Sequence, residues 1–176
     1  MTVGALSLPL ASVLTGQPEV IGSSVLSAAA AAVSFQFPAV YRAVLVEAYI
    51  KNDANAKTVT VYLNGDSGNN YSRQYIDADG ATVTGARGTA GRFDINASGI
   101  AASASASFTL LVVKSTAAAK AQLITSCSYN PATPPRLDIR GGEWSNTADL
   151  LSRIDIAALS NNFAANTSIT VWGYRL

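Results

Sequence analysis

The chain has 176 residues, a length that suits one domain with a sizeable core. Only 13% of its residues are charged, and its net charge is +1. This composition disfavours nucleic-acid binding, which needs clustered lysines and arginines for the phosphates, and it fits a chain that hides much of its surface in an assembly.

The composition also disfavours catalysis and metal binding. No histidine occurs, which removes the commonest general base and the commonest metal ligand. The single cysteine, Cys127, excludes an intrachain disulfide and a cysteine-rich zinc site. Cys127 falls at an alternating strand position, so we interpret it as a small core residue; a catalytic thiolate would lack a histidine partner. We therefore expect no enzyme activity, no cofactor and no metal.

The first part of the chain predicts an arm and not a folded element. Residues 1–31 are rich in Ala, Ser, Leu, Val and Gly and show no clear period. We predict an extended N-terminal arm over 1–31, ordered by contacts with the domain or a neighbour, and one domain over 32–176. A frayed tail is the alternative. The side chains that we expect to attach the arm to another surface are apolar: Leu6, Leu8, Leu10, Val13 and Leu14.

Neither a membrane span nor a secretory signal is expected. No stretch reaches the roughly 18 apolar residues of a transmembrane helix. The apolar N-terminus has no lysine or arginine before Arg42, whereas a secretory signal begins with a positive region.

From residue 33 onward the apolar residues repeat with a period of two. About ten short runs of this kind, separated by turn residues, indicate an all-β sandwich or barrel. Residues 44–50 carry apolar side chains on both faces, so we expect a central strand that is covered on both sides. The predicted strands span 33–37, 44–50, 59–63, 71–76, 93–95, 108–114, 123–129, 137–140, 152–158 and 168–175.

Two polar segments are candidates for recognition. In residues 64–70, Asn-Gly-Asp-Ser-Gly-Asn-Asn predicts a tight turn, with a cation or carbohydrate loop as the alternative. The second segment is the polar stretch from residue 77 to residue 92. Residues 77–80 predict a solvated turn, with a pair of chelating carboxylates as the alternative, and residues 87–92 predict an exposed, mobile loop at the tip of the sandwich, where β scaffolds often carry recognition residues. The candidate recognition residues of this second segment are Asp77, Asp79, Arg87 and Arg92.

The last predicted strand carries two large aromatic residues on one face. Trp172 and Tyr174 share that face with Thr170, opposite Ile169 and Val171. If the isoleucine face packs in the core, the aromatic face is wet unless another subunit covers it. Trp172 and Tyr174 are therefore our candidate subunit interface, with packing under a local loop as the alternative.

Two blocks of the sequence resemble a known family. Residues 59–71 end in Asn-Gly-Asp-Ser-Gly-Asn-Asn-Tyr. Residues 141–176 contain Gly-Gly-Glu-Trp-Ser-Asn-Thr, then an alternating strand, then a closing segment with Phe, Ser and Gly. In this order and spacing the blocks resemble a family of tailed-bacteriophage virion proteins. One position departs from the family pattern: Asn166 stands where Gly is usual, and since Asn tolerates a left-handed backbone we expect the turn to form.

The resemblance implies a single jelly-roll-like β-sandwich, usually trimeric, with a structural or adhesive role. Within that family, the short chain without a fibrous shaft and with an apolar arm favours a capsid decoration (cement) protein. Its expected partners are its own copies, as a homotrimer, and the major capsid protein or other virion proteins, with no nucleic acid and no membrane. The alternative is a tail-fibre or receptor-binding tip domain that recognises host glycans. Either role places the protein in the virion, on the capsid surface or the tail.

Overall fold

The computed structural model describes residues 17–53, 58–96, 99–101, 104–129 and 136–175. These residues form twelve β-strands, and no helix occurs among them. The strands are β1 (Glu19–Val25), β2 (Ala32–Gln36), β3 (Ala43–Lys51), β4 (Val59–Leu63), β5 (Tyr71–Asp79), β6 (Thr82–Ala90), β7 (Phe93–Asp94), β8 (Ser105–Val113), β9 (Ala121–Tyr129), β10 (Arg136–Trp144), β11 (Arg153–Ala158) and β12 (Ser168–Tyr174).

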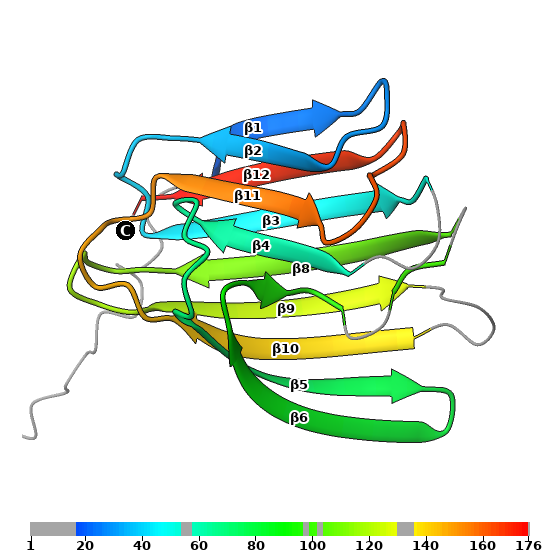
Figure 1. Ribbon diagram of the computed structural model, residues 1–176. Helices are drawn as coiled ribbons and strands as arrows, with labels where there is room; N and C mark the ends of the chain where they lie inside the picture. The colour runs from blue at the N-terminus through cyan, green and yellow to red at the C-terminus, as the bar shows by residue number, and fades with distance from the viewer. Residues whose placement is uncertain (1–16, 54–57, 97–98, 102–103, 130–135, 176) are drawn as a thin grey trace, which may run out of the picture.

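The strands form two antiparallel sheets that pack face to face. The large sheet has eight strands in the order β1-β12-β3-β8-β9-β10-β5-β6, and the small sheet has four in the order β2-β11-β4-β7. Figure 1 shows the small sheet lying over one part of the large sheet, while the β5–β6 hairpin extends beyond it. The predicted all-β sandwich is therefore confirmed.

The connectivity is that of a jelly roll with one added hairpin. Eight of the strands, β2 to β7 with β10 and β11, can be lettered B to I in chain order. The small sheet then reads B-I-D-G, and the large sheet contains C, H, E and F, as in a jelly roll. The hairpin β8–β9 is inserted between C and H, and β1 and β12 extend the sheet beyond C.

The core lies between the sheets and follows the predicted alternation. All ten predicted strands are present. In most of them apolar residues at every second position face the other sheet, whereas in β10 the charged Asp138 and Arg140 take these positions. Cys127 is among these buried residues, and burial raises the pKa of its thiol to about 12, as expected of a structural cysteine. The fully buried aliphatic core includes Val44, Val46, Ile50, Val59, Val61, Leu63, Leu110, Val112, Ile154, Ile156 and Val171.

One prediction about β3 is wrong. The strand is central in its sheet, as expected, but only one of its faces is covered. Glu47 and Tyr49 are exposed on the other face, since the small sheet packs on one side only.

Two strands were missed, and both lie at the edges of the large sheet. Residues 77–91 are not a loop: they complete β5 and form β6, which turn at Gly80 with φ +58°. Residues 1–31 are not free of strand structure either, because β1 pairs with β12. Both edges consist mainly of exposed residues, so their sequences lack the alternation that reveals a strand.

The predicted turns form as expected. Asn64 and Gly65 both have positive φ, at 53° and 70°, as a tight Asn-Gly turn requires. Asn166 has φ +65°, so asparagine takes the left-handed position without a glycine.

Candidate functional site

The broadest candidate site is the face of the large sheet that points away from the small sheet, here called the outer face. Pairing across the strands places Trp172 beside Leu45, Leu45 beside Leu111, and Leu111 beside Ile124. This gives an apolar row that crosses four strands. The core of the domain does not include this row, and contiguous apolar side chains on an uncovered face are typical of an interaction surface.

The outer face becomes more apolar toward β5 and β6. Ile139 pairs with Ile76, and Leu137 lies two positions along from Ile139. We call the following exposed residues the apolar patch: Ile76, Val83, Ile124, Leu137 and Ile139, which are between 45% and 67% exposed. Their neighbours on the same face are mostly serine, threonine, glutamine and glycine, so the patch has a polar rim with few charges.

A broad groove of about 1160 Å³ runs along the polar end of the patch. Gly141 and Gly85 leave its floor open, and Gln74, Gln122 and Arg87 line it. Its one acidic outer-face residue, Glu143, is paired with Lys120 at 2.7 Å. The exposed guanidinium of Arg87 is therefore the cation that the groove offers to a partner.

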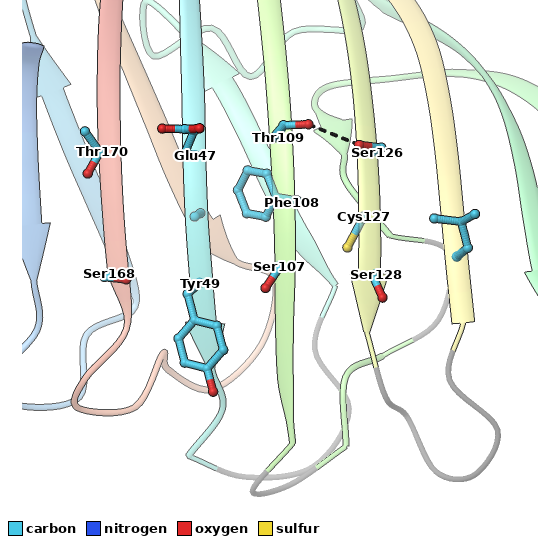
Figure 2. A pocket seen from close by; sticks show the side chains of 12 residues that line it. Glu47, Tyr49, Ser107, Phe108, Thr109, Ser126, Cys127, Ser128, Ser168 and Thr170 are labelled. Atoms are coloured by element: carbon cyan, nitrogen blue, oxygen red, sulfur yellow. Dashed lines mark hydrogen bonds between the residues drawn. The ribbon is translucent and has the colours of Figure 1, made fainter.

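A second hollow of about 520 Å³ lies where β8 and β9 carry small hydroxyl side chains (Figure 2). Figure 2 shows Glu47, Thr109 and Ser126 in one row across the strands, and Tyr49, Ser107 and Ser128 in the next. The hydroxyls of Thr109 and Ser126 lie 3.1 Å apart. These groups donate and accept hydrogen bonds but carry no charge, a chemistry that suits polar neutral groups of a partner.

The candidate interface residues Trp172 and Tyr174 lie on the outer face, as predicted. Both are half-buried, and Trp172 donates its indole N–H to Glu47 at 2.8 Å. Their strand is not at an edge, however, because β1 lies outside it. Trp172 is one end of the apolar row, and Tyr174 lies two positions along the same strand, beside Ala43.

The four candidate recognition residues are not brought together. Asp77 and Asp79 point to the inner side of the β5–β6 hairpin, where Arg136 pairs with both. Arg87 pairs in register with Gln74 on the outer face, and Arg92 binds Asp94 at 2.8 Å. The expectation of one shared loop is wrong, since the strand alternation sends neighbouring side chains to opposite faces.

The inner side of β5 and β10 holds a cluster of buried charges that sequence analysis missed. Asp138 and Arg140 are 0% and 2% exposed, and Nη2 of Arg140 lies 3.2 Å from Oδ1 of Asp138. The guanidinium of Arg140 also stacks on Tyr75, 4.5 Å from the ring centre. Burial raises the pKa of the nearby Asp77 carboxyl, and the negative charge of Asp138 raises it further, while Arg136 opposes the shift.

The raised pKa of Asp77 predicts a specific pH dependence. An ionised Asp77 is less favourable in the folded state than in the unfolded state, so its contribution to stability falls as pH rises from the usual aspartate pKa through the raised one. Asp77→Asn should therefore increase the free energy of unfolding at neutral pH, and its advantage should shrink on acidification through that window. Urea unfolding of both proteins across the acidic range measures the difference. A difference that is constant with pH would contradict this assignment.

The Asn64–Asn70 segment serves structure. Asp66 accepts hydrogen bonds from the N–H of Gly68, the amide of Asn70 and the indole of Trp144, at 2.7 to 2.8 Å. Asn64 accepts from the backbone N–H groups of Ser152 and Arg153, where β11 begins. The turn is thus tied to distant strands, and the side-chain oxygens of Asn64 and Asp66 accept hydrogen bonds from the protein itself. No group of three or more potential metal-ligating side chains occurs within the described ranges.

Lys114 is a second buried charge without a signal in the sequence. Its ammonium lies over the Trp144 ring, 5.3 Å from the centre, and donates to the carbonyls of Ala117, Ala119 and Asn146. Burial lowers its pKa. By donating to carbonyls of both, Lys114 joins the loop after β8 to the loop after β10. This role of its ammonium is structural.

The predicted attachment residues Leu6, Leu8, Leu10, Val13 and Leu14 lie outside the described residues. No helix in the described part of the chain is long and apolar enough to span a membrane. Comparison with known proteins adds no assignment: no family model, no curated protein and no solved structure matches the chain.

Proposed function

We propose that this chain is a structural protein of a tailed-bacteriophage virion, which assembles as a homotrimer and decorates the capsid surface. Its partners are its own copies and the major capsid protein, and the proposal gives it no catalytic role. The observation that carries the proposal is the outer face of the large sheet, which is wide, poor in charge and apolar along one row and one patch. The sequence motifs that resemble virion proteins give the context.

The outer face has the composition of a subunit interface. Interface cores are depleted in charge, enriched in aromatic and large aliphatic residues, and surrounded by a polar rim. Trp172 and Ile139 supply such anchors at separate places on the face, and serines and threonines surround them. Burying the exposed part of such side chains contributes free energy in proportion to area, about 25 cal/mol per Å².

Trp172 tests the trimer directly. We expect light scattering of the full chain at micromolar concentration to give a trimer mass. Trp172→Ala should weaken association by about 2 kcal/mol, or about 30-fold, because it removes a large aromatic anchor. Leu159→Ala is the matched control, since Leu159 is 49% exposed but lies after β11, away from the outer face. A monomeric full chain, or equal effects of both substitutions, would refute the trimer through this face.

A specific observation favours a second candidate. The hydroxyl-lined hollow and the groove below Arg87 offer hydrogen-bonding groups that suit a saccharide, as a receptor-binding tip domain on host glycans would need. Cosedimentation separates the two candidates: a decoration protein binds expanded capsids, and a tip domain binds host cells. Binding to cells alone would replace the decoration proposal with the tip domain.

A further inference from the structure

The last strand of the large sheet, β6, has an open edge. Eight of its nine residues are exposed and the ninth is half-buried. Within the described part of the chain, β5 is the one strand that pairs with it, in an unbroken register from Asp79 and Thr82 to Tyr71 and Ala90. Every second residue of β6 therefore turns its N–H and C=O toward solvent. A long, regular edge of this kind is a template for one more strand.

The two edges of the sheet differ in how they are protected. The pairing of β1 with β12 is interrupted by a register shift between Val20 and Gly22, and a bulge of this kind discourages a further strand. β1 also begins with Glu19, which pairs with Arg175 at 3.0 Å. β6 has neither a bulge nor a proline, and its single charge is Arg87. The open edge is therefore a property of β6 in particular.

We propose that the N-terminal segment of a neighbouring subunit, residues 2–14, adds to β6 as a further strand, and this rests on the proposed trimer. The segment has no charge, and Leu6, Leu8 and Leu10 alternate with Ser7 and Pro9. On β6 the three leucines would lie on one face of the enlarged sheet. That face is the outer one, where Val83 and Ile76 end the apolar patch.

Pro9 fits this placement. Proline has no N–H and is tolerated in a strand when that side faces solvent. A strand added to β6 becomes the new edge, so the missing N–H points outward and discourages yet another strand. The same segment would thus both close the open edge and end the sheet.

Chain length favours a neighbouring subunit as the source. The segment leads into β1, which lies at the opposite edge of the sheet from β6. A strand added beyond β6 lies eight strand spacings from β1, or about 38 Å, since strands lie about 4.8 Å apart, and an extended residue covers about 3.3 Å. A segment reaching that place on its own subunit would spend about twelve residues before Glu19 on the crossing, so Leu8 and Leu10 would not arrive. A segment from the next subunit has no such constraint, and head-to-tail exchange closes into a ring of three where the rotation between subunits is one third of a turn.

Disulfide trapping between subunits tests the proposal. One set of chains carries Ala5→Cys, Ser7→Cys or Ala11→Cys, which alternate with the leucines, and the other carries Thr84→Cys or Ala86→Cys on the opposite face from Val83. Cys127 is fully buried and needs no removal. After the two sets are mixed and mildly oxidised, non-reducing gels should show a mixed two-chain product for at least one combination. Its yield should exceed that of the exposed control Leu159→Cys by about tenfold or more, because docking raises the effective concentration.

Three outcomes overturn the proposal. Products from a β6 variant alone, above the control, would mean that β6 pairs with β6 of a second copy. A third chain carries both Ser7→Cys and Ala86→Cys. A disulfide that forms within this chain, and not between the two mixed sets, would mean that the segment folds back on its own subunit. No product in any combination would mean that it does not reach β6. Light scattering measures the oligomeric mass independently of the disulfide. A trimer in which no disulfide forms would therefore refute the strand addition and leave the proposed function intact.

Discussion

Asp138→Ala should lower the free energy of unfolding by about 3 to 5 kcal/mol, the range found when one partner of a buried ion pair is removed. The substitution leaves the Arg140 guanidinium 2% exposed and without the carboxylate to which it donates at 3.2 Å. The contact of Arg140 with the Tyr75 ring and its attraction to the Asp77 carboxylate offset only a part of this cost. Urea unfolding followed by far-ultraviolet circular dichroism measures the loss.

A double replacement separates the charge effect from a packing effect. Replacing both residues of the pair by apolar residues of similar volume removes both buried charges, so that neither is left unpaired in the interior. Such double replacements are often neutral or stabilising. Asp138→Leu combined with Arg140→Met should therefore be more stable than Asp138→Ala. If the double variant is the less stable of the two, lost packing and not an unpaired charge explains the single variant.

Trp144→Ala should cost a similar amount, about 3 to 5 kcal/mol, since it empties the space of a fully buried indole. The ring also supports two contacts from other parts of the chain. Its N–H donates to Asp66 at 2.7 Å in the Asn64–Asn70 turn, and its face lies under Lys114. Thermal unfolding and urea unfolding, both followed by circular dichroism, report the change without relying on tryptophan fluorescence.

Trp144→Phe is the matched variant, because it keeps most of the ring and removes the N–H. Asp66 keeps its hydrogen bonds from Gly68 and Asn70. We expect a smaller loss of about 1.5 to 3 kcal/mol, the usual contribution of a hydrogen bond to a charged group. If Trp144→Phe is as harmful as Trp144→Ala, the hydrogen bond and not the ring volume is the main contribution.

The two proposals divide the large sheet between two kinds of contact. The outer face offers side chains, with Trp172 and the apolar patch as anchors, and the edge at β6 offers backbone groups. Side-chain contacts set which surface is recognised, and backbone pairing depends little on sequence. A trimer that uses both would be held by a shaped interface and by strand exchange, which suits a protein that must stay on a particle surface.

The strands that form the sandwich can be predicted from the sequence. Where apolar residues of a strand pack in the core, as in Val59–Leu63 and Ser168–Tyr174, their alternation is visible in the chain. The sequence also predicts the Asn64 turn, the left-handed Asn166 and the inert character of Cys127, because each depends on local backbone preference or on residue type. The virion role is a proposal, for which the two sequence blocks at residues 59–71 and 141–176 supply the resemblance.

Which residues share a surface depends on how distant strands pair, and the sequence does not show this pairing. β1 and β6 are exposed edges, so tertiary pairing and not local pattern places them in the sheet. The face on which a charge lies depends on strand register, and this separates Asp77 from Arg87 although both belong to one hairpin. The burial of Asp138, likewise, comes from packing between segments that are distant in the chain, and no local pattern encodes such packing.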